Sequence, residues 1–400
     1  MGLLSWLTIA LASALTVAAP VVCLLVWDRL GSNRVIRLTV RTALLLATQI
    51  LAVALAGLVL NRTYGFYTSW SELLGGPIVT TTAAPATAGN AGRADAAYAA
   101  STAAAYRAGH GTVVRITIPG AASGVAARTA LVYLPAAYGN PAAAGVSFPV
   151  VELLDGFPGS PWSWTGPMQV QHVLDKLIAG MQSLPFIAVM PTQNISYPRD
   201  AECVNVVGGA QVDTYLTTDV HRTMTSNFRA SSSPSSWSTM GFSTGGYCAI
   251  NLAMRHPDMF SAAVSLSGTG RPSHDHSTGD LFGRSIAIGD SNTPFWEAAH
   301  WNSRNRLSIM MIAGSAEPLE YRDARGLPGL ARGTLTITNT LIAHGGHNFT
   351  LWRAVEPYAF NWLSTLLRAP LQPVLIRTGL LPAQRPAVAA QRLPMPTNRN

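Results

Sequence analysis

The chain has 400 residues and a formal net charge of +8, and two short stretches carry all of that charge: residues 28–41 and the sequence beyond Glu356. The rest of the chain is neutral, whereas a nucleic-acid-binding domain would carry a basic face on its folded part. The composition therefore excludes that class of protein. The length suits one catalytic domain of about 250 residues with appendages.

The first 60 residues contain two apolar runs, Leu3–Trp27 and Ala43–Leu60, which have no charged side chain. A helix of about 20 apolar residues spans the hydrocarbon core of a bilayer. The first run is longer than the apolar part of a signal peptide and has no basic segment before it. We therefore interpret residues 1–60 as a membrane anchor of two transmembrane helices.

The arginines between the two runs predict the orientation of the anchor. Positively charged loops stay in the cytoplasm, so residues 28–42 are expected to face inward. Residues from 61 onward are then expected outside the cytoplasm. The predicted localisation is the cell membrane, crossed twice, with an extracytoplasmic catalytic domain.

Residues 61–111 are expected to connect the anchor to the catalytic domain. Asn61–Gly76 is rich in Tyr, Trp and Phe, which favour the membrane–water boundary. Val79–Gly111 is rich in Ala, Thr and Gly and has too few large apolar side chains to fold alone. The sequence predicts an aromatic collar followed by a flexible linker that is partly helical at most.

Residues 112–368 alternate between short apolar runs and helical segments, which predicts the catalytic domain. The expected strands are 112–118, 130–134, 149–154, 186–190, 262–266, 308–312 and 335–341. The expected helices are 168–181, 214–228 and 355–367. Strands that alternate with helices predict the α/β class, with a mostly parallel central sheet covered by helices on both faces. Residues 369–400 are expected to be a basic, Pro-rich, disordered tail.

The sequence MGFSTGGYCA places Ser243 between glycines at a predicted strand-to-helix turn. Trp237–Met240 reads as a short strand, and Gly246–Met254 reads as a helix. A turn this tight strains the serine backbone and requires glycine on both sides. The pattern predicts that Ser243 is an exposed nucleophile. The N–H of Thr244 would then face a developing oxyanion.

The second oxyanion donor is expected in the sequence LLDGFPGS, residues 153–160. This loop follows a buried strand, and Gly156 lets the backbone turn sharply. Phe157 is the predicted donor, because Pro158 has no N–H. A plain turn of this composition is the alternative interpretation.

The histidine is expected late in the chain, in AHGGHNFTLW at residues 343–352. His347 follows two glycines and comes just before a predicted helix, so it can reach Ser243. His344 is closer to the end of a predicted strand, and we interpret it as structural. The order serine, acid, histidine then requires an acid between Ser243 and His347.

Glu317 is the predicted acid, because it comes just after the strand at 308–312 and a turn that contains glycine. Its role would be to accept the imidazole N–H and stabilise the imidazolium. Glu320 and Asp323 are on the same loop and remain alternatives. Each of the three can equally be an ion-paired surface acid.

The sequence SHDHSTGD at residues 273–280 contains four groups that could bind a metal, His274, Asp275, His276 and Asp280. Zinc sites usually need a further, well-spaced ligand, and none is marked elsewhere in the sequence. We therefore expect this loop to act as a lid or to form one edge of the substrate site. We expect no metal and no other cofactor.

The two cysteines of the catalytic domain, Cys203 and Cys248, lie in a compartment where a disulfide is permitted. Cys203 follows the strand at 186–190, and Cys248 follows Ser243 on the next helix. Two unpaired buried thiols remain the alternative, because the sequence does not supply the distance that a bridge requires.

Three segments together resemble the esterase D-like family of α/β-hydrolases, which also contains the mycobacterial secreted mycolyltransferase antigens. They are residues 237–268 around the serine, LLDGFPGS and GGHNFTLW. The resemblance covers Thr112–Leu367 and implies the α/β-hydrolase fold. It also implies the site residues, which are Ser243, His347 and Glu317 as the triad and the N–H groups of Phe157 and Thr244 as the oxyanion hole.

The chain departs from the mycolyltransferases in two respects. Those proteins are secreted without two membrane spans, and they typically carry a tryptophan two positions after the histidine, where this chain has Phe349. We therefore expect a membrane-anchored serine esterase. The two spans and the aromatic collar suggest that it acts on a lipid or an acylated envelope glycan, with an aminoacyl-lipid ester among the options. The alternatives are an acyltransferase that uses a sugar or lipid hydroxyl in place of water, and a non-catalytic binding domain on the same fold.

Overall fold

The structure is a computed structural model that describes residues 5–27, 33–64, 70 and 93–368. Most of the expected aromatic collar, the first part of the expected linker and the whole basic tail lie outside the described residues. The chain divides into two compact units, one with the N-terminal helices and one with the sheet. Each unit is described by itself below.

The N-terminal unit contains two long apolar helices, α1 (Trp6–Val26) and α2 (Arg34–Tyr64), which pack against each other. Stretches of 21 and 28 residues in them are long and apolar enough to cross a membrane. Most of their large side chains are exposed, as a lipid environment would allow. These helices are compatible with the expected membrane anchor.

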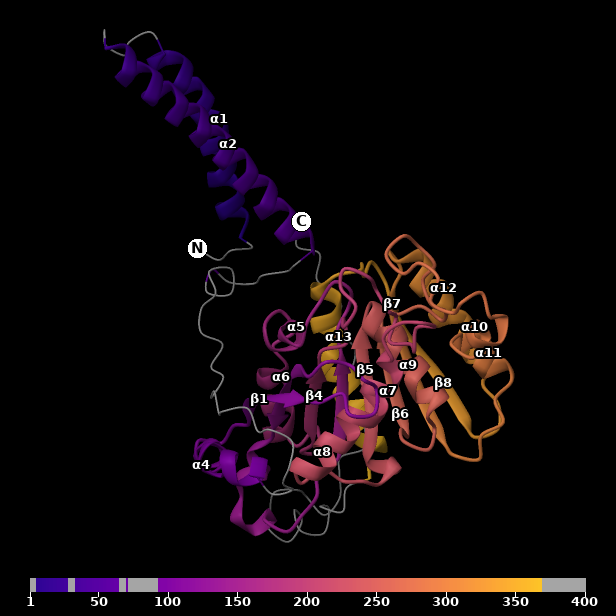
Figure 1. The fold of residues 1–400 in the computed structure, drawn as a ribbon. Coiled ribbons are helices and arrows are strands. Elements are labelled where there is room, and N and C mark those ends of the chain that lie inside the picture. The colour runs from indigo at the N-terminus through magenta and orange to yellow at the C-terminus, as the bar shows by residue number, and fades with distance from the viewer. Residues whose placement is uncertain (1–4, 28–32, 65–69, 71–92, 369–400) are drawn as a thin grey trace. The chain divides into compact units, whose positions relative to one another are not determined.

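An eight-stranded sheet forms the centre of the second unit, in the order β1-β2-β4-β3-β5-β6-β7-β8 (Figure 1). Strand β2 pairs antiparallel with both β1 and β4, and the remaining pairs are parallel. The strands are β1 (Thr112–Ile118), β2 (Arg128–Leu134), β3 (Val150–Leu154), β4 (Ile187–Pro191), β5 (Trp237–Phe242), β6 (Ala262–Leu266), β7 (Leu307–Gly314) and β8 (Leu335–Ile342). The predicted α/β class with a mostly parallel sheet is confirmed.

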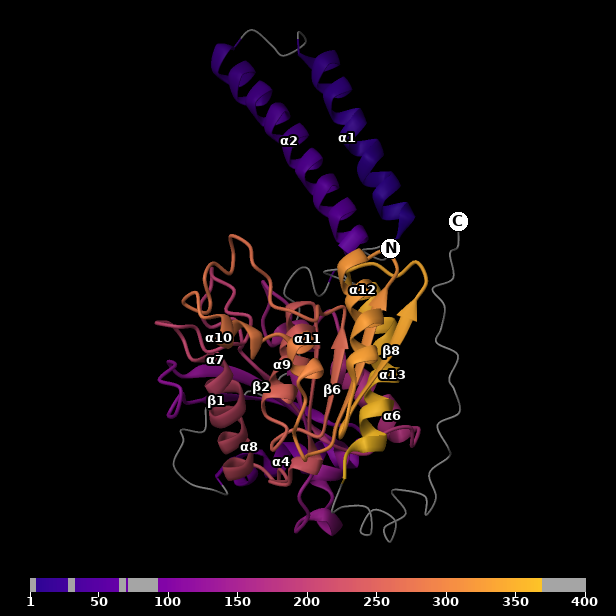
Figure 2. The same ribbon diagram turned by 90° about the vertical axis from the view of Figure 1, so that its right-hand side faces the viewer.

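Helices cover both faces of the sheet, with α6 and α13 on one face and α8 and α9 on the other (Figure 2). The helices are α4 (Arg93–Arg107), α5 (Trp162–Thr165), α6 (Val170–Ala179), α7 (Val212–Thr214), α8 (His221–Asn227), α9 (Thr244–Arg255), α10 (Ile286–Asp290), α11 (Pro294–Ala299), α12 (Pro318–Gly326) and α13 (Phe349–Leu366). A π-helix, η3 (Tyr215–Val220), joins α7 to α8. Short 3₁₀ helices are η1 (Ala136–Gly139), η2 (Pro141–Ala143), η4 (Pro234–Ser236) and η5 (Leu327–Leu330).

The apolar patterns explain these elements. Every residue of β3, β4 and β6 is buried, as expected of strands covered on both faces. Helix α6 buries Val170, Leu174 and Leu177, which share one face at helical spacing. Strands β3 and β5 are adjacent and parallel, so their carboxyl ends open on the same edge of the sheet.

The linker was expected to be partly helical at most, and its second part contains helix α4, which packs on the catalytic unit. Tyr98 is buried, its hydroxyl donates to the Arg115 carbonyl at 2.9 Å, and its ring stacks on Phe228. Alanine has the highest helix propensity, and one buried tyrosine anchors a helix whose other side chains are mostly small. The linker prediction considered only the small number of large apolar side chains and gave no weight to the single Tyr98 anchor.

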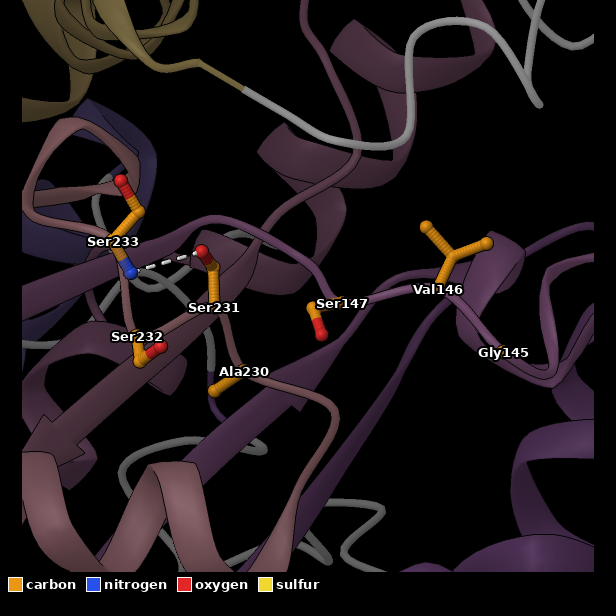
Figure 3. A pocket seen from close by; sticks show the side chains of 7 residues that line it. All are labelled: Gly145, Val146, Ser147, Ala230, Ser231, Ser232 and Ser233. Atoms are coloured by element: carbon orange, nitrogen blue, oxygen red, sulfur yellow. Dashed lines mark hydrogen bonds between the residues drawn. The ribbon is translucent and has the colours of Figure 1, made fainter.

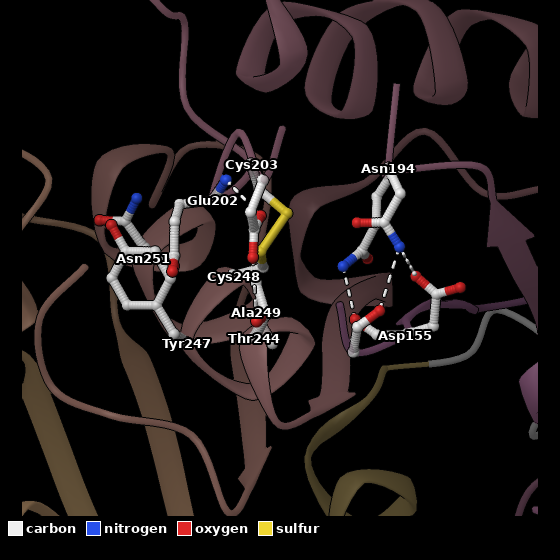
Figure 4. The surroundings of a disulfide bond; sticks show 12 residues. Asp155, Asn194, Glu202, Cys203, Thr244, Tyr247, Cys248, Ala249 and Asn251 are labelled. Atoms are coloured by element: carbon white, nitrogen blue, oxygen red, sulfur yellow. Dashed lines mark hydrogen bonds between the residues drawn. A yellow bond between two sulfur atoms is a disulfide. The ribbon is translucent and has the colours of Figure 1, made fainter. Parts of the chain in front are cut away.

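A disulfide joins Cys203 to Cys248, which settles the alternative left open by the sequence (Figure 4). Their Cα atoms are 5.6 Å apart. Cys203 lies in the segment after β4, and Cys248 lies on α9 just beyond Ser243. The bridge therefore ties the segment after β4 to the helix that follows Ser243.

Removal of this disulfide in a Cys203→Ala/Cys248→Ala variant should lower both stability and substrate affinity. The bridge closes a loop of 45 residues, which stabilises a fold by roughly 4 kcal/mol in the chain-entropy model. Thermal unfolding of the full chain in detergent should show a lower midpoint, and KM should rise. Cys23→Ala, in α1, is the matched control and should change neither. Equal midpoints with and without the bridge would contradict this assignment.

A cavity of about 510 Å³ opens at the amino ends of β3 and β5 (Figure 3). It is lined by small residues: Gly145, Val146, Ser147, Ala230, Ser231, Ser232 and Ser233. None of the predicted site residues is among them, and Ser243 follows the opposite end of β5. This cavity is therefore separate from the candidate active site.

Candidate active site

Ser243 occupies a strained turn between β5 and α9, with φ 57° and ψ −128°. This backbone conformation is costly for a residue with a side chain. A Cβ on Gly241 would lie 2.0 Å from the Gly245 carbonyl oxygen, and one on Gly245 would lie 2.3 Å from the Leu154 carbonyl oxygen. Both glycines are therefore required by close backbone packing. Steric clash was the predicted reason for glycine at these positions, and the backbone packing agrees with it. The turn presents the Ser243 hydroxyl beyond the end of β5.

His347 lies on the loop between β8 and α13, and its Nε2 is 2.8 Å from the Ser243 Oγ. This distance is a hydrogen bond. The imidazole is partly exposed, which leaves room for a substrate beside it. His344 is exposed, and its backbone N–H donates to the Ser315 hydroxyl. Of the two histidines considered from the sequence, the structure places His347 against the serine.

Glu317 is the acid that meets the other side of this imidazole. Its Oε1 lies 3.2 Å from the His347 Nδ1, whereas the nearest Glu320 oxygen is 3.8 Å away. Asp323 is held elsewhere, because it accepts from the Gly270 N–H and pairs with a neighbouring arginine. The geometry therefore favours Glu317 among the three acids that the sequence left open.

The two oxygens of the Glu317 carboxylate have different surroundings. Oε2 accepts hydrogen bonds from the Gly314 N–H at 2.8 Å and the Ser267 hydroxyl at 3.0 Å. Oε1 is buried and accepts no hydrogen bond of good geometry within the described residues, so the His347 ring is the nearby donor available to it. The carboxylate is fixed at one oxygen and open to the imidazole at the other.

Ser267 and Trp352 form a positioning pair that the sequence did not reveal. The Trp352 indole N–H donates to the Ser267 Oγ at 2.9 Å. Because an indole only donates, the Ser267 hydroxyl proton is left to point at Glu317. The Trp352 ring also contacts the His347 ring edge-on, with centroids 5.2 Å apart. Both residues therefore help to orient the acid and the imidazole.

The loop after β3 lies against Ser243, where an oxyanion hole is expected. A Cβ on Gly156 would lie only 3.1 Å from the Ser243 Cβ. The Asn194 side-chain amide donates to the Gly156 and Gly159 carbonyls and fixes the loop. The backbone N–H groups of Phe157 and Thr244 donate no hydrogen bond within the described residues. Both N–H groups are thus available for a substrate oxygen.

Three acids of the loop after β3 and the segment after β4 are buried, Asp155, Asp200 and Glu202. Figure 4 shows Asp155 next to Asn194 and Glu202 next to Cys203. The Asp200 carboxylate accepts from the Thr244 hydroxyl at 3.3 Å. Burial, reinforced by the charge of Asp200, raises the pKa of Glu202 to about 8, and burial raises the pKa of Asp155 well above its usual range. Glu202 is therefore mostly protonated at neutral pH.

The loop at residues 273–280 uses its acids to shape its own backbone. Asp275 accepts from the N–H and hydroxyl of Ser277, and Asp280 accepts from the Phe282 N–H. Arg199, from the segment after β4, donates to carbonyls of this loop. Among the described residues, no group of three or more His, Cys, Asp or Glu side chains is arranged to hold a metal.

The strand order and the serine turn are those of an α/β-hydrolase. The sequence matches the Esterase family over residues 125–354, more than half of the chain. The chain therefore belongs to that family, whose fold and class are those of a serine ester hydrolase. The narrower resemblance to the esterase D-like group stays a prediction.

A relative from Corynebacterium glutamicum, described as an uncharacterized protein, is 27% identical over 269 residues, which are 64% of this chain. The match spans 62% of that relative's length.

Solved structures with the same fold include a ferulic acid esterase, with 20% identity, a TM-score of 0.53, and coverage of 64% of this chain and 99% of that one. An S-formylglutathione hydrolase from Agrobacterium tumefaciens has 16% identity, a TM-score of 0.54, and coverage of 65% and 97%. At these identities the comparison shows the fold.

Replacement of Glu317 by Gln should lower kcat roughly a hundredfold to ten-thousandfold, because the amide no longer stabilises the imidazolium. KM should change little, since the side chain is buried behind His347. Glu320→Gln is the matched control and should cost less than tenfold. Steady-state kinetics on a p-nitrophenyl ester measure both. A larger loss for Glu320→Gln would give the acid role to that residue.

Replacement of Trp352 by Phe should lower kcat by about 2- to 12-fold, which corresponds to the loss of one neutral hydrogen bond at about 0.5–1.5 kcal/mol. Ser267→Gly should also lower kcat, and because Ser267 has φ 54°, glycine relieves backbone strain there. If Trp352 acts through the Ser267 hydroxyl, Trp352→Phe adds no further loss in the Ser267→Gly background. Additive losses in kcat would show that the two residues act independently.

Proposed function

We propose that this protein is a membrane-anchored serine esterase that cleaves carboxylic esters through an acyl-enzyme on Ser243. The observation that carries the proposal is the continuous contact from the Ser243 Oγ to the His347 imidazole, at 2.8 Å, and on to the Glu317 carboxylate, at 3.2 Å. Family membership and the strained turn at Ser243 support the same reading. The proposed catalytic residues are Ser243, His347 and Glu317.

In the first half-reaction the Ser243 Oγ attacks the acyl carbon, and its proton passes to the His347 Nε2. The carbonyl π electrons move onto oxygen, and the N–H groups of Phe157 and Thr244 stabilise the resulting oxyanion. Glu317 accepts from the Nδ1–H and stabilises the imidazolium. Collapse of the intermediate breaks the ester C–O bond, and His347 returns its proton to the leaving alcohol.

In the second half-reaction a water molecule takes the place of the alcohol. His347 removes a proton from the water, whose oxygen attacks the acyl carbon of the Ser243 ester. Collapse of this second tetrahedral intermediate releases the carboxylic acid and returns the proton to Ser243. A sugar or lipid hydroxyl in place of water would give acyl transfer by the same steps, so the acceptor alone separates the two reactions.

The proposed substrate class is an ester of a membrane lipid or an acylated envelope glycan. Two helices that are long and apolar enough to span a bilayer support a membrane location. The arginines at positions 34, 37 and 41, at the start of α2, support a cytoplasmic loop before that helix. An extracytoplasmic catalytic domain would then meet esters at the outer membrane surface or in the cell envelope.

Hydrolysis of p-nitrophenyl esters by the purified full chain should depend on Ser243. Ser243→Ala should lower kcat by at least roughly ten-thousandfold, because the acyl-enzyme no longer forms. Ser232→Ala, which changes an exposed serine of the distant cavity, is the matched control and should keep full activity. Retention of activity in Ser243→Ala, or no activity in the wild type on any ester, would contradict the proposal.

The acceptor is tested in the same assay by the addition of a sugar or glycerol. An esterase releases free acid at an unchanged rate, and mass spectrometry finds no acylated acceptor. A product dominated by acylated acceptor would assign the protein as an acyltransferase.

A further inference from the structure

Four exposed apolar side chains lie on two hydrogen-bonded segments beside the candidate active site. They are Tyr197 (69% exposed), Val207 (49%), Ile286 (80%) and Ile288 (37%). We call these four residues the rim patch. Exposed apolar residues that are scattered singly need no explanation, whereas neighbouring ones mark an interaction surface.

The two segments that carry the rim patch are joined along their length. The Val207 N–H donates to the Leu281 carbonyl at 3.0 Å, and the Val207 side chain packs directly over Gly283. Ile286 begins α10 three residues after Gly283. Nearer the other end, Arg199 donates to the Thr278 carbonyl at 2.7 Å. The rim patch therefore belongs to one continuous double segment.

This double segment also borders the serine. The Tyr197 ring lies 6.2 Å from the Phe157 ring, which belongs to the loop of the expected oxyanion hole. Asp200 accepts from the Thr244 hydroxyl, next to Ser243. The two segments follow β4 and β6, whose carboxyl ends lie on the Ser243 edge of the sheet. A surface that binds the rim patch therefore lies next to the entrance of the active site.

The bilayer that would hold α2 is an apolar partner that always lies within reach of the catalytic unit. Helix α2 ends at Tyr64 and α4 begins at Arg93, so 28 residues connect them. Such a connection reaches at most about 95 Å, at about 3.4 Å per residue. With α2 in a bilayer, the catalytic unit never leaves that bilayer's vicinity. Weak apolar contacts then suffice, because tethering raises the effective concentration.

The size of the rim patch fits a bilayer better than a protein partner. A stable protein interface buries about 800 Å² on each side, from some 20 to 30 residues, which is far more than four side chains supply. Shallow insertion into the headgroup region needs only a few aromatic and aliphatic side chains. Tyrosine in particular favours the membrane–water boundary.

We infer that the rim patch docks the catalytic unit onto the bilayer that holds α1 and α2, so that the site takes an ester of a lipid directly from the membrane. This inference rests on the proposed esterase function and narrows its substrate to a membrane lipid. Phe157 and Ser243 then face the surface from which the lipid enters. Val207 and Ile286 contribute to docking and take no part in the ester chemistry.

The test uses the full chain reconstituted in vesicles of phosphatidylethanolamine and phosphatidylglycerol. An environment-sensitive NBD dye is attached to Ile286→Cys in a Cys23→Ala background. Met181→Cys is the matched control, because Met181 is 49% exposed and follows α6 near the amino end of β4. The dye at position 286 should shift to the blue and be quenched by doxyl-labelled lipid, whereas the dye at position 181 should do neither.

Catalysis provides the second readout. An Ile286→Ser/Val207→Ser variant should hydrolyse soluble p-nitrophenyl acetate at the wild-type rate. It should hydrolyse a fluorogenic diacylglycerol embedded in the vesicles about tenfold more slowly. Equal dye responses at positions 286 and 181, or equal losses on both substrates, would overturn the docking. A dye response that grows with protein density at fixed lipid would assign the rim patch to a second copy of the chain.

Failure of the membrane docking and failure of the esterase function give different experimental results. The dye experiment does not require catalysis, so a silent dye with normal Ser243-dependent hydrolysis overturns the docking alone. Loss of p-nitrophenyl acetate hydrolysis from every form of the protein overturns the esterase function and leaves the dye result to decide whether the surface binds lipid.

Discussion

The strained backbone of Ser243 is the constraint on which the rest of the site depends. A residue with φ 57° and ψ −128° persists only where its neighbours allow no other path. Strand β5 leads into the turn and is held between β3 and β6, and helix α9 follows the turn and packs on β5 and β6. The sheet therefore fixes the chain both before and after Ser243. Glycines at 241 and 245 are the consequence, because the backbone on each side leaves no room for a Cβ. The same close packing brings the loop at Gly156, which carries the Phe157 N–H, against the serine.

The second half of the site is organised around one carboxylate. Glu317 is almost fully buried, so its charge needs partners, and Gly314 and Ser267 supply them at a single oxygen. The other oxygen is left to the imidazole. Glu202 is also buried, and burial together with the charge of Asp200 raises its pKa to about 8. Hydrogen bonds thus compensate the burial of Glu317 at one oxygen, whereas burial favours the uncharged form of Glu202.

Local patterns in the sequence were sufficient to predict the fold and the strained strand-to-helix turn at Ser243. Buried strands are continuous apolar runs, and a G-x-S-x-G sequence between a strand and a helix has a steric meaning that needs no distant contact. The choice among Glu317, Glu320 and Asp323 could not be made in this way, because all three follow the same strand. Only the path of the loop with His347 separates them, and that path depends on how β7 and β8 pair.

Other features could not be predicted from the sequence, because they depend on contacts between residues that are far apart in the chain. Ser267 meets Glu317 across 50 residues and Trp352 across 85, and no spacing in the sequence connects these residues to one another. Asn194 supports the Gly156 loop by the same kind of contact. The packing of helix α4 was not predicted, because Tyr98 finds its pocket only after β1 and α8 are in place. The disulfide required the distance between the segment after β4 and α9, which the folded chain alone provides.

The central claim is that Ser243 is the nucleophile, and covalent trapping with a fluorophosphonate tests it most directly. The reagent phosphonylates an activated serine and forms a stable adduct, which peptide mass spectrometry can locate. Our account predicts one adduct per chain, on the peptide that contains Ser243, and no adduct in His347→Ala, where the hydroxyl has no base. An adduct on another serine, or labelling that persists after Ser243→Ala, would contradict it.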